Sequence, residues 1–75
     1  MTDDFSFNIV DYLGAFSKSK SGWSTELNLV SWGGREPKYD IRSWSPDHKK
    51  MGKGITPTKE ELVALKDLLN EKEIN

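Results

Sequence analysis

The chain has 75 residues, enough for one domain with a thin core, and its lack of cysteine excludes disulfides and thiolate metal sites. No apolar run approaches the roughly 20 residues that a membrane-spanning helix needs, and the acidic start at residues 1–4 is unlike a signal peptide. We therefore expect one cytoplasmic domain, with residues 1–7 flexible, a sheet over residues 8–56 and a helix over residues 58–72. Because so small a core gives little stability, we also expect a homodimer.

The net charge of −1 hides an uneven distribution of charge along the chain. Residues 16–54 carry eight basic and four acidic side chains, a local excess of +4, and the segments on either side are acidic. Contacts to phosphate depend on charges within a screening length of about 8 Å rather than on the total. The total alone argues against nucleic acid as a partner, whereas the middle of the chain favours it.

Four segments have the pattern of β-strands. Their expected bounds are residues 8–17, 23–32, 38–44 and 51–56. The second segment alternates, with Leu27 and Leu29 on one face and Glu26 on the other, as in a half-buried strand. Gly33 and Gly34 predict a tight turn before the third segment. An antiparallel sheet is the arrangement that these short connections favour.

The last element is predicted to be a helix. Thr58 is a good N-cap, and Glu61 completes a capping box with it. Four leucines recur at helical spacing and are expected to form the dimer interface: Leu62, Leu65, Leu68 and Leu69. The expected fold class is therefore α+β, a four-stranded antiparallel sheet followed by one C-terminal helix (ββββα), dimerising through the helix.

One face of the predicted sheet combines large aromatic and basic side chains. Strand alternation places Trp32, Lys38, Arg42 and Trp44 on it, and Phe16, Lys18, Lys20 and Lys53 extend it from the other strands. Aromatic rings stack on unpaired bases, at about 1–3 kcal/mol per base, while cations neutralise the phosphates. The alternative is that the tryptophans pack beneath the helix or in a dimer interface. We expect Trp23 in the core, and Asp40 and Glu26 paired with Arg42 or a lysine.

Catalytic and cofactor sites have little support in the sequence. His48 is the single histidine, and without cysteine or a second histidine it makes a poor metal site. The glycine pairs match neither a phosphate-binding loop nor a dinucleotide-binding motif. Lys49 and Lys50 are interpreted as a solvated loop. We therefore expect no enzyme activity, no cofactor, no metal, no membrane association and no small-molecule substrate.

Several motifs together resemble a known family. The strand Asp40-Ile41-Arg42, the segment Lys53-Gly54-Ile55-Thr56 and the capped leucine helix resemble the positive cofactor four transcriptional coactivators. Residues 16–23, with Trp32-Gly33-Gly34, look like the bacterial YdbC-type branch of that family. The resemblance covers roughly residues 8–70. It implies a ββββα unit that dimerises through its helix and binds single-stranded DNA.

The resemblance also assigns roles to single residues. Arg42 and Lys53 match positions that contact the nucleic-acid backbone, while Trp32 and Lys38 match positions that present an aromatic ring and a lysine to the strand. Trp44 matches the aromatic end of the third strand. In this hypothesis Phe16 also stacks on bases, and Lys18 and Lys20 also hold phosphates.

The leading hypothesis from sequence is a single-stranded DNA-binding protein with little sequence specificity and RNA as a second ligand, an accessory factor in transcription or DNA maintenance. The alternative is a protein–protein interaction module that docks a transcription partner through its aromatic face or its helix.

Overall fold

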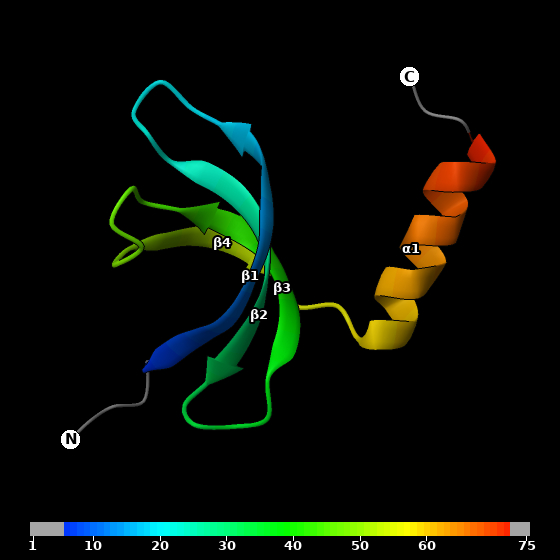
Figure 1. Ribbon diagram of the computed structural model, residues 1–75, viewed down its shortest axis with the longest axis horizontal. Coiled ribbons are helices and arrows are strands. Elements are labelled where there is room, and N and C mark those ends of the chain that lie inside the picture. Colours follow the sequence, from blue (N-terminus) through cyan, green and yellow to red (C-terminus); the bar gives the residue numbers. More distant parts are fainter. Residues whose placement is uncertain (1–5, 73–75) are drawn as a thin grey trace.

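A computed structural model describes residues 6–72 of the chain, as four antiparallel strands followed by one helix (Figure 1). The elements are β1 (Phe7–Lys18), β2 (Ser24–Trp32), β3 (Lys38–Trp44), β4 (Met51–Ile55) and α1 (Lys59–Lys72). Each strand pairs with its neighbours in the sequence, so the sheet order is β1-β2-β3-β4. The predicted ββββα fold class and element order are thus confirmed, whereas dimerisation through the helix stays a prediction. Among the described residues, no helix has the length and apolar character to cross a membrane.

Strand β1 departs from regular alternation because its pairing with β2 is interrupted three times. The residues left without a partner at these interruptions are Val10, Leu13 and Phe16. A β-bulge sets two residues of one strand against one of the other and increases the local twist. The sheet accordingly curves, with the β1–β2 and β3–β4 loops on one side and α1 on the other (Figure 1). We call the loop side the concave face and the α1 side the convex face.

The most deeply buried side chains lie on the concave face. Val30 and Trp44 are completely buried, and so are the polar residues Asn28 and Asp40, while Glu26 is 2% exposed. These residues occupy alternate positions of β2 and β3, where Asn28 pairs with Asp40 and Glu26 pairs with Arg42. The predicted alternation of both strands is correct, but the face that carries the polar side chains is the enclosed one.

Phe7 covers part of this core. Its ring centroid lies 5.2 Å from that of Trp44 and 6.0 Å from that of Trp32. Phe7 is the first residue of β1, whereas the expected flexibility of residues 1–7 stays a prediction. Residues 1–5, which the same expectation included, lie outside the described residues.

The helix begins with the predicted capping box. The Glu61 amide donates to the Thr58 hydroxyl at 3.0 Å, and the Thr58 amide donates to the Glu61 carboxylate at 2.9 Å. No residue of α1 is buried, because the helix stands away from the sheet (Figure 1). Two short polar contacts thus define the start of the helix, while its apolar side chains have little to pack against.

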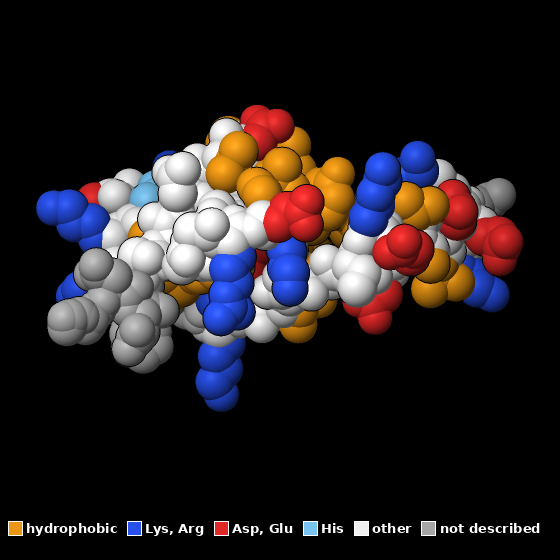
Figure 2. Space-filling model, turned by 90° about the horizontal axis from the view of Figure 1, so that it is seen from below, with side chains coloured by type: hydrophobic (Ala, Val, Ile, Leu, Met, Phe, Trp, Pro, Cys, Tyr) orange, Lys and Arg blue, Asp and Glu red, His pale blue; other side chains and the backbone are white. Residues whose placement is uncertain are grey.

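An apolar groove of about 520 Å³ separates α1 from the convex face. Sheet residues Phe16, Leu27 and Ile41 line one wall, and helix residues Leu62, Leu65 and Leu69 line the other. Figure 2 shows hydrophobic side chains gathered on the part of the sheet that faces the helix. Trp32 and Trp44 lie on the opposite face, so the alternative in which they pack beneath the helix is excluded.

Candidate nucleic-acid interface

Arg42 is held rigidly on the concave face by Asp40 and lies over Trp32. Its Nε and a terminal nitrogen donate to the two carboxylate oxygens of Asp40, at 2.6 and 2.8 Å. The guanidinium carbon is 4.8 Å from the centroid of the Trp32 ring, a cation–π contact. The Asp40 carboxylate is completely buried and also accepts from the Thr56 hydroxyl. The expected pairing of Asp40 with Arg42 is therefore confirmed.

Trp44 is unavailable for base stacking in this structure. It lies on the same face as Trp32, as predicted, but its side chain is completely buried. Phe7 packs against it, and the His48 ring stacks on it with centroids 5.7 Å apart. The prediction of an accessible ring was wrong because the β3–β4 loop and the start of β1 close over the end of β3.

Phe16 also differs from its prediction, since it lies on the convex face. The spacing of two between Phe16, Lys18 and Lys20 predicts one face for all three, but Phe16 is the unpaired residue of the bulge between Ala15 and Ser17. Its ring therefore lines the apolar groove with Leu27 and Ile41, on the side away from Trp32. At 65% exposed it is the most accessible large apolar side chain described.

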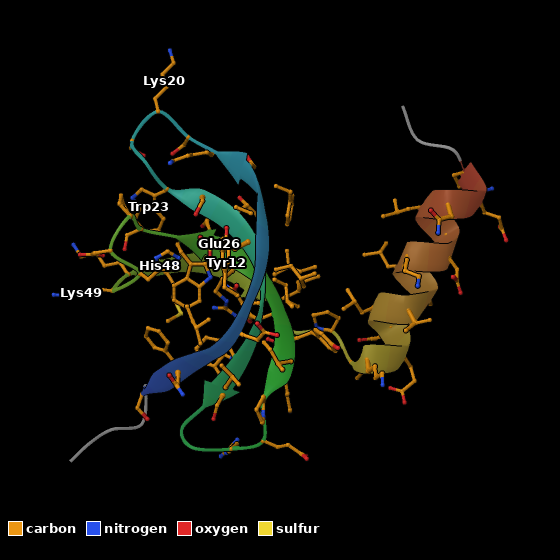
Figure 3. The ribbon with its side chains drawn as sticks, viewed as in Figure 1. Tyr12, Lys20, Trp23, Glu26, His48 and Lys49 are labelled. Atoms are coloured by element: carbon orange, nitrogen blue, oxygen red, sulfur yellow. The ribbon has the colours of Figure 1, made fainter. Side chains whose placement is uncertain are left out.

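The predicted lysines are all solvent-exposed and come from separate elements. Lys18 pairs with Ser24, and Lys38 pairs with Val30, positions on the concave face. Lys20 lies in the β1–β2 turn, where its side chain extends into solvent (Figure 3). Lys53 lies in the edge strand β4, within an interruption of its pairing with β3. Lys18 and Lys38 thus place two separated cations on the concave face, while Lys20 and Lys53 lie in a turn and in an edge strand.

Glu26 pairs with His48 rather than with Arg42 or a lysine, contrary to expectation. The His48 Nε2 lies 2.8 and 3.0 Å from the two carboxylate oxygens of Glu26. Ser24 and Asn28 also donate to this carboxylate. Burial by itself raises the pKa of the Glu26 carboxyl, but the hydrogen bonds from these three partners outweigh burial, so the pKa lies below its ordinary value of 4.5. Glu26 is therefore ionised at neutral pH.

The Glu26–His48 pair fastens the β3–β4 loop to the sheet. His48 has a φ of 61°, a left-handed conformation that is uncommon outside glycine. Next to it, the Lys49 amide and the Ser45 hydroxyl donate to Asp47, and both bonds lower the pKa of its carboxyl. Lys49 and Lys50 are exposed on this loop, as expected of a solvated segment.

The two loops of the concave side meet each other. A side-chain carbon at Gly22 would lie 2.9 Å from the Pro46 ring, so only glycine fits there without a shift. Trp23 follows directly and lies on the loop side with His48 and Lys49, rather than under the helix with Leu27 (Figure 3). Trp23 precedes the first residue of β2, so the alternation used to predict its position does not extend to it. No local sequence pattern indicates the pairing of Glu26 with a histidine 22 positions away.

No group of three or more metal-ligating side chains occurs within residues 6–72.

Comparison with known proteins identifies the family of this chain. The family model described as Transcriptional Coactivator p15 (PC4) matches residues 19–68, which include β2, β3, β4 and most of α1.

A protein of Treponema pallidum (strain Nichols), described as uncharacterized, is 56% identical over 70 residues, covering 93% of this chain and 82% of the relative. The bacterial relative is consistent with a bacterial branch of the family. Since the family model spans more than half of the sequence and the element order agrees with the predicted ββββα unit, the chain belongs to the PC4 family of single-stranded DNA-binding domains.

Proposed function

We propose that this protein binds single-stranded DNA, and RNA as a second ligand, along its concave face with little sequence specificity. The observation that carries this proposal is the family match over residues 19–68, because those residues supply Trp32, Lys38 and Arg42. PC4 domains bind single-stranded DNA and are not enzymes. We infer the same activity here, in an accessory factor of transcription or DNA maintenance without catalytic function.

The geometry supports an unpaired strand rather than a duplex. Trp32 is half-buried and its ring is held by Arg42, so it forms a rigid surface for a base. Duplex bases are already stacked on one another, whereas unpaired bases are free to stack on a protein ring. The charge of Arg42 is compensated by Asp40, so we assign the phosphates mainly to exposed lysines: Lys18, Lys20, Lys38 and Lys53.

A fluorescence anisotropy titration tests this proposal. Labelled oligo-dT, a matched duplex and oligo-U RNA are each titrated at two salt concentrations. We expect the single strands to bind more tightly than the duplex, and log affinity to fall with log salt by about 0.7 for each phosphate neutralised. Equal affinity for strand and duplex, or no binding of either, contradicts the proposal.

Charge reversal of a lysine tests the assignment of phosphates. Lys38→Glu and Lys53→Glu each alter an exposed side chain, so the fold is expected to survive. Both variants are expected to bind oligo-dT more weakly and with a smaller salt dependence. Lys72→Glu, in the last turn of α1, is the matched control and is expected to bind like the parent protein. Unchanged binding by both sheet variants contradicts the assignment.

We further propose that a second copy of the chain fills the groove beside α1. A helix without buried residues beside an apolar sheet face leaves a large accessible apolar surface, which favours association. Leu62, Leu65 and Leu69 line the groove, while Leu68 is proposed to lie at its margin. Leu65→Glu is expected to convert the dimer to a monomer in sedimentation experiments. The control is Ala64→Glu, because Ala64 lines a different hollow on the helix. A dimer that persists in the Leu65→Glu variant contradicts the proposal.

The second candidate function, docking of a protein partner of transcription, is favoured by the same exposed leucines. The two functions respond differently to the variants above. A docking module is expected to lose its partner in Leu65→Glu and to keep it in Lys38→Glu. A nucleic-acid binder is expected to lose oligonucleotide affinity in Lys38→Glu while remaining folded.

A further inference from the structure

The concave face has a hollow of about 310 Å³ at the end where the two loops meet. Its walls include Tyr12 and Lys18 from β1, Ser24 and Glu26 from β2, and Pro46 and His48 from the β3–β4 loop. Figure 3 shows Tyr12, Glu26 and His48 together on this side of the sheet. The volume is at the lower end of the range for small-molecule sites, about 300–1,000 Å³, so it suits a ligand of one or two rings.

The hollow combines groups of a kind that phosphate binding does not require. A buried carboxylate repels a phosphate, yet Glu26 lines the same hollow as the cationic Lys18. An aromatic ring, an imidazole and mixed charges are instead the groups that recognise the flat face and the pairing edge of an unpaired base. The chemistry of the hollow therefore fits a nucleobase better than the sugar–phosphate backbone.

The Glu26 carboxylate fixes the tautomer of His48. An ionised carboxylate only accepts hydrogen bonds, so the Nε2 that lies 2.8 Å from it must carry a proton and donate. In the neutral imidazole the second nitrogen, Nδ1, is then a bare acceptor. Within the part of the chain that the structure describes, both side-chain hydrogen bonds of His48 involve Nε2, so Nδ1 has no side-chain partner there, and the His48 side chain is 38% exposed.

We propose that this hollow is a subsite for one nucleobase, in which His48 Nδ1 accepts a hydrogen bond from an exocyclic amino group. The inference rests on the proposed function and adds one base-reading position to a face that is otherwise tolerant of sequence. Tyr12 forms the aromatic wall and Lys18 the cationic side of the subsite. Glu26 acts as a positioning residue, since it acts on the base only through His48.

Cytosine and thymine distinguish this subsite from general stacking. They differ at one corner of the pairing edge, where cytosine has an amino donor and thymine has a carbonyl acceptor. An acceptor at His48 favours the amino group and opposes the carbonyl. We therefore expect the protein with a neutral His48 imidazole to bind oligo-dC about tenfold more tightly than oligo-dT, the effect of one well-placed base contact.

Glu26→Gln tests the positioning role because it changes the hydrogen-bonding character of the side chain and little else. A glutamine amide is able to donate to Nε2, which allows the other tautomer, with the proton on Nδ1. We expect this variant to lose the preference for oligo-dC or to reverse it. Glu36→Gln, an exposed position in the β2–β3 turn with the same change of charge, is the control and is expected to keep the preference.

The experiment is an anisotropy titration of the parent protein and both variants with the two oligonucleotides, alongside circular dichroism to check folding. Equal binding of oligo-dC and oligo-dT by the parent protein overturns the subsite but leaves the proposed function intact. A preference that survives in folded Glu26→Gln also overturns it. Should that variant fail to fold, His48→Gly, which suits a left-handed φ and has no side-chain acceptor, replaces it and must bind both oligonucleotides equally. Binding of neither oligonucleotide by the parent protein contradicts the proposed function itself.

Discussion

The two faces of the sheet reverse the usual relation between hydropathy and burial. The concave face carries carboxylates, an amide and an arginine, yet it contains the most deeply buried side chains of the described chain. The convex face carries leucine, isoleucine and phenylalanine, yet it remains accessible along an open groove. An exposed apolar patch of this kind on a single chain usually marks a site of association with a partner. Burial here follows the curvature of the sheet and the position of the loops rather than the polarity of the residues.

The two buried carboxylates tolerate burial on the concave face because their hydrogen bonds are made. Asp40 accepts from Arg42 and Thr56, and the carboxylate of Glu26 accepts from three partners. A buried charge that lost these partners would retain its full desolvation cost. The network therefore fixes one arrangement of the loops and strands, whereas the leucines of the convex face do not select one arrangement within a single chain.

The largest expected effect on stability comes from a substitution on the concave face, where the buried side chains lie. Trp44→Ala removes a completely buried indole from between Phe7 and His48 and leaves a cavity. We expect the free energy of unfolding to fall by about 4 kcal/mol, a large part of the stability of so small a domain. Urea denaturation followed by circular dichroism measures this loss.

Trp44→Phe is the matched control for that variant. The Trp44 indole N–H is buried and has no acceptor within residues 6–72, so phenylalanine removes an unsatisfied donor while keeping a ring in place. We expect this variant to lose much less stability than Trp44→Ala. Comparable losses would mean that the core requires the full volume of the indole rather than an aromatic ring alone.

Local patterns predicted the elements well. The period of two placed the strands, and the Thr58–Glu61 capping box marked the start of the helix at the correct residue. The prediction that Arg42 and Trp32 share a face was correct because β2 and β3 pair without interruption. Strand alternation and capping motifs reflect regular backbone geometry, so predictions within regular segments were correct.

The failures occurred where the geometry is irregular or the contact is distant. Phe16 was assigned to the wrong face because each bulge of β1 shifts the alternation by one residue, and no turn residue marks the bulge at that position. His48 was dismissed because its partner, Glu26, is far away in the sequence and only the folded loop brings them together. The elements of the site were therefore predictable, whereas the side chains that close it were not.

A smaller effect is expected from acid, again on the concave face. The folded pKa of Glu26 lies below its ordinary value of 4.5, so the unfolded chain binds more protons in acid. The ionised carboxylate therefore stabilises the fold above about pH 4.5, and this contribution is lost as the pH falls through the folded pKa. Glu26→Gln is expected to lose less stability between pH 5 and pH 3 than the parent protein, roughly the window in which such a carboxylate titrates.

Urea midpoints across that range measure the difference, and Glu36→Gln serves as the control because its carboxylate is exposed. Identical acid dependence in the parent protein and Glu26→Gln would show that the histidine and its neighbours do not stabilise the ionised form. A similar reduction in Glu36→Gln would assign the effect to net charge instead.

The smallest expected effect comes from the convex face. Phe16 is 65% exposed, so Phe16→Ser removes little buried surface from a single chain, and we expect a change of about 0.5 kcal/mol or less in its unfolding free energy at concentrations that keep it monomeric. The same substitution takes a ring out of the groove that a second copy is proposed to fill, so it is expected to weaken self-association in sedimentation experiments. A variant that left association unchanged but lost as much stability as Trp44→Ala would reverse the comparison, because it would put the stabilising core on the convex face.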